Sequence, residues 1–241
     1  MTLPIVFRMI RWSVAAIAAL FGLAMFLYPG GTFFNRSAPR YSFFQNSLSD
    51  LGSRIAWGGQ ENSLSAMFSV AGSIILVLAG VACLVTLVRV CSSSRTMGWL
   101  ARLAGTVGML SCGALIGASL APEDRNSVLH GQFTILGVAS FPVTTALCAW
   151  VMARSGRFRR RAPIGLLVLT LLLIVWIAAM AWHPTTGAEL MIPVTLQKIV
   201  MIGLLGNLLL QSYEAERAVA GVTAERSNTR LQPTSRADAA P

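Results

Sequence analysis

Six long apolar stretches dominate this chain, and they constrain its fold more than any other feature of the sequence. About 20 consecutive apolar residues are enough for a helix to cross the hydrocarbon core of a bilayer. Charged residues make up only 12% of the 241 residues, whereas soluble domains carry about 25%. We therefore predict an all-α membrane protein, a six-transmembrane-helix bundle, with spans at about 12–28, 64–90, 99–120, 128–153, 164–182 and 190–210.

The bundle accounts for residues 1–212, and the residues beyond it differ in composition. Residues 213–241 are polar, rich in Ala, Arg, Ser and Thr, and lack apolar periodicity. Such a segment has too little apolar surface to offset the entropy that ordering would cost. We predict a short helical extension after the last span, followed by a disordered cytoplasmic tail.

The distribution of arginine predicts how the bundle is oriented. Fourteen arginines fall on one side of the six-span topology, and four fall on the other, namely Arg36, Arg40, Arg54 and Arg125. Loops that stay in the cytoplasm carry an excess of basic residues. Both termini are therefore predicted to be cytoplasmic, in a multi-pass protein of the cell (inner) membrane. The segments that face outward are then 41–52, 122–126 and 183–189.

The net charge of +10 comes from these short basic loops and not from one basic surface. A nucleic-acid-binding protein would gather its lysines and arginines on one soluble face. We therefore predict the lipid bilayer as the partner of this chain, and no nucleic acid.

Polar and ionisable residues gather on the predicted outer side. Part of the set lies in the connection 41–52, which mixes aromatic rings with amide, hydroxyl and carboxylate groups. The rest follows later in the chain, near the ends of the spans. We predict that one outward-facing pocket is lined by Asn46, Ser49, Asp50, Asp124, His130, His183 and Lys198.

Lys198 is the least expected member of this set. It lies eight residues into the sixth span, about 12 Å below the start of the helix at 1.5 Å per residue. An ionisable side chain at that depth faces the bundle interior or a wet cavity and finds a partner there. We expect the partner to be an outer carboxylate, either Asp50 or Asp124.

Each candidate also has a purely structural interpretation. Asp50 is suited to capping a short helix, since a carboxylate accepts hydrogen bonds from free backbone N–H groups. Asp124 fits a solvated turn. His183 follows Trp182 and suits the membrane interface, where amphipathic rings settle. For Lys198, an ion pair with a purely structural role is as good an explanation as a functional one.

A metal site is a further interpretation of the outer residues. His130, His183 and Asp50 would supply three ligands to a catalytic zinc and leave one position for water. Membrane ceramidase-type hydrolases use a related arrangement with a third histidine, but this chain has only two. Its four cysteines lack zinc-like spacing. We therefore predict no metal and no cofactor.

Three short motifs resemble a known family. They are Asn-Ser-Leu-Ser-Asp-Leu-Gly at 46–52, Pro-Glu-Asp at 122–124 followed by His130-Gly131, and Leu-Gln-Lys at 196–198. Over residues 13–210 the chain resembles the bacterial and archaeal domain-of-unknown-function 998 membrane family. A weaker similarity is to the Frag1/DRAM/Sfk1 membrane proteins. In that family a basic residue stands at the position of Lys198, which implies that Lys198 acts together with the outer aspartates. The resemblance implies no particular reaction.

Together these features predict a binding or transport protein rather than an enzyme. Its outward-facing polar pocket would accommodate a lipid headgroup or a small polar ligand. The alternatives are a metal-assisted membrane hydrolase that uses His130, His183 and Asp50, and a scaffold without catalytic activity. A proton-coupled carrier would need Lys198 or a carboxylate to titrate near the working pH.

Overall fold

The computed structural model describes residues 3–92, 94–182 and 184–231. Six α-helices form there, each long and apolar enough to cross a membrane, which confirms the predicted all-α, six-helix architecture. A short 3-10 helix, η1, lies between the first two. The elements are α1 (Leu3–Leu27), η1 (Asp50–Gly52), α2 (Ser63–Cys91), α3 (Arg95–Leu120), α4 (Ser127–Ser155), α5 (Arg161–Ala181) and α6 (Gly187–Leu231).

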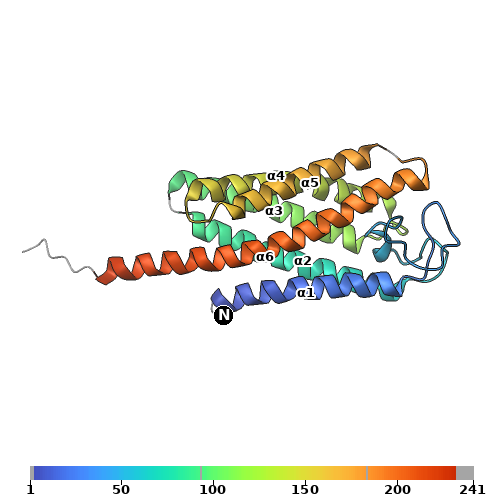
Figure 1. Cartoon of the computed structure of the whole chain (residues 1–241), viewed down its shortest axis with the longest axis horizontal. Helices are drawn as coiled ribbons and strands as arrows, with labels where there is room; N and C mark the ends of the chain where they lie inside the picture. The colour runs from blue at the N-terminus through green and yellow to red at the C-terminus, as the bar shows by residue number, and fades with distance from the viewer. Residues whose placement is uncertain (1–2, 93, 183, 232–241) are drawn as a thin grey trace, which may run out of the picture.

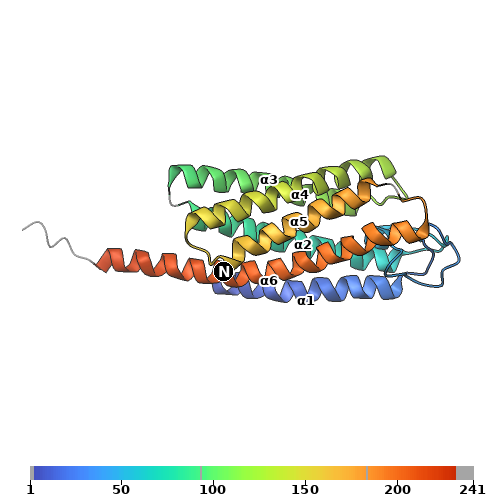
Figure 2. The same ribbon diagram turned by 45° about the horizontal axis from the view of Figure 1, so that its top comes forward.

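The helices form a closed antiparallel bundle (Figure 1). Consecutive helices pack against each other, and α6 returns to pack against α1. Helix α2 also contacts α4 and α6, so it lies nearest the centre of the bundle. The long α1–α2 connection sits at one end, while α1 begins and α6 ends at the other (Figures 1 and 2). We call these the loop end and the terminal end.

The outward faces of the helices carry large apolar side chains. On α5, Leu167, Leu171 and Ile174 are exposed, whereas Leu169 and Leu173 are buried in the bundle. In water such a surface would be unfavourable, but in a bilayer it faces lipid chains of similar polarity. The structure is therefore compatible with an integral membrane protein.

Local signals explain where several helices begin and end. The side chain of Ser94 accepts a hydrogen bond from Met97 N at 3.3 Å, and Asn126 accepts one from Leu129 N at 3.0 Å. Both are N-cap contacts that satisfy a free donor of the first turn. Gly156 ends α4 with a φ of 66°, a left-handed conformation that glycine adopts without strain.

Helix α6 runs further than its predicted span, which ended near residue 210. It continues to Leu231 and projects beyond the bundle at the terminal end (Figure 1). Tertiary contacts stabilise the first turns of this extension, because Ala215 and Ala218 are buried against neighbouring helices and Glu214 is fully buried. The predicted tail is thus helical over 213–231, and residues 232–241 lie outside the described part.

Candidate functional site

The α1–α2 connection is folded into a compact cap over the loop end. Two segments of the connection approach each other closely at Gly31. The φ of Gly31 is 84°, and a Cβ added there would lie 2.0 Å from Gly58 N. Gly58 N donates a hydrogen bond to Gly30 O at 3.1 Å. A side chain at position 31 would be excluded by both the conformation and the space. The glycines therefore allow two distant parts of the connection to meet.

Asp50 and Ser47 hydrogen-bond each other across the turn that leads into η1. The carboxylate of Asp50 accepts from Ser47 N at 2.9 Å and from Ser47 Oγ at 2.7 Å. Ser47 Oγ in turn accepts from Asp50 N at 3.1 Å. Each residue thus satisfies a backbone donor of the other, as in a capping box, although the N-cap residue of η1 is Ser49 and makes no side-chain cap bond. The bonds give Asp50 a structural role in this turn.

Asn46 links this turn to the rest of the cap and to α6. Its Nδ2 donates to Asp50 Oδ2 at 2.9 Å and to Gly31 O at 3.0 Å, and the residue is fully buried. Its backbone oxygen accepts hydrogen bonds from Tyr41 Oη, at 3.1 Å, and from Lys198 Nζ. One asparagine therefore joins the carboxylate, the cap backbone and the buried amine.

Helix α6 holds the cap through two neighbouring residues. Lys198 is only 4% exposed, and its amine lies 5.6 Å from the ring centre of Tyr41 and 5.5 Å from that of Phe43. These are cation–π distances. Gln197 accepts a hydrogen bond from Leu48 N at 2.8 Å. The buried lysine thus faces the interior, as predicted, and anchors the cap.

The predicted direct ion pair of Lys198 is not formed. Among the described residues, neither Asp50 nor Asp124 is within 4.0 Å of the lysine amine. The Asp50 carboxylate instead accepts hydrogen bonds from Asn46 and Ser47. Its link to Lys198 is indirect, because Asn46 contacts both.

Asp124 lies elsewhere, on the turn between α3 and α4. Its carboxylate accepts from Arg54 N at 3.1 Å and from Ile55 N at 3.2 Å, and it is exposed. It therefore ties this turn to the cap rather than joining the lysine cluster.

His130 lies at the start of α4 and faces the end of α3. Its Nδ1 is 3.0 Å from Ala118 O and 2.9 Å from Ala121 O. Since both partners are carbonyl oxygens, Nδ1 carries the proton and donates. The other candidate histidine, His183, lies outside the described residues.

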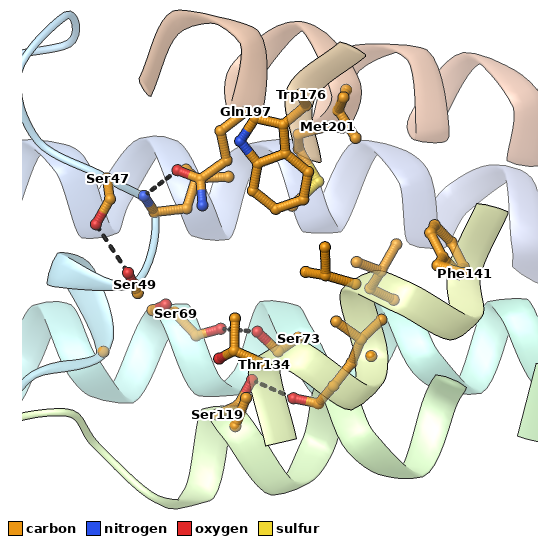
Figure 3. A pocket seen from close by; sticks show the side chains of 18 of the residues that line it. Ser47, Ser49, Ser69, Ser73, Ser119, Thr134, Phe141, Trp176, Gln197 and Met201 are labelled. Carbon is orange, nitrogen blue, oxygen red and sulfur yellow. Dashed lines mark hydrogen bonds between the residues drawn. The ribbon is translucent and has the colours of Figure 1, made fainter. Parts of the chain in front are cut away.

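Below the cap is a cavity of about 310 Å³, which we call the loop-end cavity (Figure 3). Every one of the six α-helices, together with the cap, contributes to its wall. Most of the lining is apolar, and none of the described lining residues is Asp, Glu, Lys or Arg. Its polar lining residues are Ser47, Ser49, Ser69, Ser73, Ser119, His130, Thr134, Trp176 and Gln197.

The polar groups concentrate at one end of this cavity. Ser47 and Ser49, joined by a hydrogen bond of 2.8 Å, lie near Gln197 at the cap, whereas Phe141 lies at the opposite end (Figure 3). Trp176 points inward from α5, and its Nε1 is buried with no hydrogen-bond partner among the described residues. A free donor in a buried position favours a ligand that brings an acceptor.

The predicted site is therefore divided between two layers. Ser49 and His130 line the cavity, while Asn46, Asp50 and Lys198 lie behind it and hold the cap in place. The prediction included neither Ser47 nor Trp176. The sequence contains a feature that points to each of them: Ser47 belongs to the same motif as Ser49, and Trp176 interrupts an aliphatic span.

Two tyrosines complete the cap as neutral groups. The Tyr28 hydroxyl accepts from Trp57 N at 3.1 Å, and burial raises the pKa of Tyr28 to about 12. Burial, followed by the charge of Asp50, also raises the pKa of Tyr41 above its ordinary value. Both phenols therefore remain protonated near neutral pH.

The described residues include no group of three or more His, Cys, Asp or Glu side chains placed to hold a metal ion. The ligand set of the alternative hydrolase, His130, His183 and Asp50, also requires a residue outside that part of the chain. Of the two described members, His130 lines the loop-end cavity and Asp50 lies behind it.

Comparison of the chain with protein-family models, with curated proteins and with solved structures found no match. The site is therefore interpreted from its own geometry.

Proposed function

We propose that this chain is a multi-pass membrane protein that binds an uncharged amphipathic molecule in the loop-end cavity. The polar group of the ligand would lie near Ser47, Ser49 and Gln197, and its apolar part would extend into the bundle. The observation that carries this proposal is the cavity itself, which is about 310 Å³, apolar over most of its wall and polar at the cap. Ligand sites commonly combine an apolar wall with a few polar groups that fix orientation.

An uncharged headgroup fits this lining better than a charged one. None of the described lining residues is Asp, Glu, Lys or Arg, and burying an unpaired charge is costly. Hydroxyl, amide and indole groups instead offer neutral hydrogen bonds. This narrows the predicted ligand from a lipid headgroup or small polar ligand to a neutral amphiphile.

We further propose that the loop end faces outward from the cell membrane and that both termini are cytoplasmic. The arginine distribution supports this orientation. The bundle is also consistent with the resemblance to the domain-of-unknown-function 998 family, which shares the cap motif 46–52, and we retain that family as a proposal.

Filling the cavity tests the proposed function. The purified protein in nanodiscs would be incubated with a fatty alcohol or a monoacylglycerol, and binding measured by native mass spectrometry and by thermal stabilisation. Val138→Trp places a large ring in the cavity wall and should abolish binding. Ile135→Trp is the matched control, because Ile135 lies on the same helix but is 71% exposed and faces lipid.

A fatty acid of the same length should bind less well than the alcohol when it is ionised. The proposal is contradicted if neither neutral amphiphile binds, or if Val138→Trp binds as the unmodified protein does while remaining folded.

A further inference from the structure

Positive charge is unevenly compensated at the terminal end of the bundle. On α6, Glu214 and Glu216 pair with arginines of α1, α5 and α6. Helices α3 and α4 contain no Asp or Glu, although they contribute Arg95, Arg102 and Arg154. These three side chains are exposed and form no ion pair or hydrogen bond with another described residue. The charge of α3 and α4 is therefore not neutralised by the described part of the chain.

Arg95, Trp99 and Arg102 form one stripe along α3, at spacings of four and three residues. Helix α3 packs against α2 and α4, and Trp99 is 59% exposed, so the stripe lies on the periphery of the bundle. Arg102 lies seven residues into the helix, about 10 Å from its start. A guanidinium group at that depth on a peripheral face extends toward the headgroup level, where it can meet an anionic partner.

Helix α4 brings a second tryptophan to the same height. The start of α3 and the end of α4 both lie at the terminal end (Figures 1 and 2). Ser111 Oγ donates to Ser140 Oγ at 2.8 Å, which fixes the register of these two antiparallel helices. Toward the terminal end, Trp99 lies twelve residues from this bond and Trp150 lies ten, so the two differ in height by about 3 Å.

The two tryptophans also lie on the same side of the α3–α4 pair. At about 100° per residue, Trp99 is about 60° from Ala114, which packs against α4. Trp150 is about 80° from Ser140, which bonds to α3, and about 140° from Thr145, which bonds to α5. Trp150 is 48% exposed. Since α2 and α5 pack on the inner side, both indoles project from the peripheral side.

The same register aligns two of the arginines. Arg95 and Arg154 lie sixteen and fourteen residues from the serine hydrogen bond, about one turn beyond the indoles and about 3 Å apart in height. Basic residues are expected at a cytoplasmic end, which accounts for their number. That preference does not account for their alignment with two tryptophans on the helix pair that lacks carboxylates.

We infer that this peripheral face binds the headgroup of an anionic phospholipid. Arg95 and Arg154 hold the phosphate, since guanidinium groups bind phosphate oxygens through paired N–H donors. Arg102 reaches the same phosphate from below, and the indoles of Trp99 and Trp150 lie beside the glycerol esters, at the level where amphipathic rings settle. The site is at the opposite end of the bundle from the loop-end cavity and does not depend on the proposed function.

The absence of carboxylates from α3 and α4 gives this face its selectivity. A zwitterionic phospholipid carries an ammonium group beside its phosphate, and these two helices offer that ammonium no ion-pair partner. An ammonium group near three arginines is instead repelled. A lipid whose headgroup has only negative charge is therefore preferred.

The test compares phosphatidylglycerol with phosphatidylethanolamine of identical acyl chains. The purified full chain is delipidated in detergent and titrated with each lipid, and binding is measured by native mass spectrometry. Phosphatidylglycerol should bind about tenfold more tightly, and it should raise the temperature of unfolding more than phosphatidylethanolamine does. This comparison uses the unmodified chain, so it does not depend on whether a variant folds.

Variants then locate the site. A triple variant that removes the three arginines of the face should lose most of the preference; it combines Arg95→Gln, Arg102→Gln and Arg154→Gln. The matched control removes three exposed arginines of the same end from α1 and the α4–α5 connection and should keep the preference; it combines Arg8→Gln, Arg159→Gln and Arg160→Gln. Trp99→Ala with Trp150→Ala should weaken both lipids alike, because the rings contact the glycerol region that the two lipids share.

Three results would overturn the inference. The first is equal binding of the two lipids by the unmodified chain, and the second is a preference that survives in the triple variant of the face. The third is an equal loss in the control variant, which would show only a general attraction of anionic lipid to a basic end. None of these results affects the loop-end cavity, whose ligands are uncharged.

Discussion

A buried lysine amine organises the cap without a direct carboxylate partner. Lys198 donates to the backbone of Asn46, and Asn46 donates to Asp50. Loss of either charged group leaves Asn46 with one buried hydrogen-bond partner fewer, which costs about 1–3 kcal/mol. The two residues should therefore be energetically coupled through Asn46, although they do not touch.

A double-mutant cycle measures this coupling. Lys198→Met and Asp50→Asn should each lower the free energy of unfolding by about 1–3 kcal/mol, and the double variant should lose less than the sum of the two. The free energy is measured by reversible unfolding of the protein in detergent. Asp124→Asn is the control partner, because its contacts are with Arg54 and Ile55, and its effect should add to that of Lys198→Met. Additive losses for Asp50 would exclude the coupling.

The raised pKa of Tyr28 predicts that the protein loses stability at alkaline pH. Burial raises its pKa in the folded state to about 12, above the ordinary value of 10.0. The stabilisation is therefore fully present below pH 10 and is lost as the pH rises toward about 12, because the unfolded chain ionises first. Unfolding measured across this window should show the decline. Tyr28→Phe should make the curve shallower there, and an unchanged slope would count against the assignment.

At the scale of the element, an ion-pair network explains why α6 continues beyond the membrane-spanning length. Glu214 is fully buried, and its carboxylate contacts Arg161 at 2.6 Å and Arg217 at 3.3 Å. It also accepts a hydrogen bond from Arg159 N, two residues before α5 begins, at 3.3 Å. These contacts fix the first turn of the extension to the neighbouring helix, where composition alone predicts only a short helical continuation.

Replacing Glu214 should therefore destabilise the terminal end. Glu214→Ala removes the buried acceptor that joins these donors and should cost about 2–3 kcal/mol. This is below the full range for a doubly buried pair, because the Arg161 side chain is 57% exposed. Glu216→Ala is the matched control: it pairs with Arg11, both partners are partly exposed, and the loss should be under about 1 kcal/mol. Unfolding in detergent measures both. Equal effects would show that the buried network does not hold the extension.

At the scale of the whole molecule, the bundle separates two chemically different ends. The cap and the polar end of the loop-end cavity lie at one end, and the start of α1 and the projecting part of α6 lie at the other (Figure 1). An even number of antiparallel spans requires both chain ends to share a side. Which side that is follows from the arginine distribution and remains a prediction.

Cysteine labelling tests the orientation. A single cysteine at exposed Ser37 in the cap should react with a membrane-impermeant maleimide in intact cells, whereas one at exposed Ser94 between α2 and α3 should react only after permeabilisation. The four native cysteines lie within the helices and provide the background measured in the unmodified chain. Reversed accessibility would overturn the proposed topology.

The sequence by itself determined the architecture of this protein. Lengths of apolar sequence near the thickness of a bilayer admit only a helix in each span, since backbone groups in lipid must bond within their own segment. The depth of Lys198 likewise required an interior partner. Both conclusions depend on local properties of the chain, and the fold agrees with them.

Only the tertiary structure decided which polar residues share a cavity. Asp50 and Lys198 both contact Asn46 but lie behind the cavity wall, and the Asp124 carboxylate accepts hydrogen bonds from the backbone of the cap. The loop-end cavity, with Trp176 and Phe141 in its wall, depends on how the helices are rotated about their axes. Lipid and the protein interior have similar polarity, so the faces of a membrane-spanning helix have nearly the same composition. The sequence therefore does not reveal which face points into the bundle.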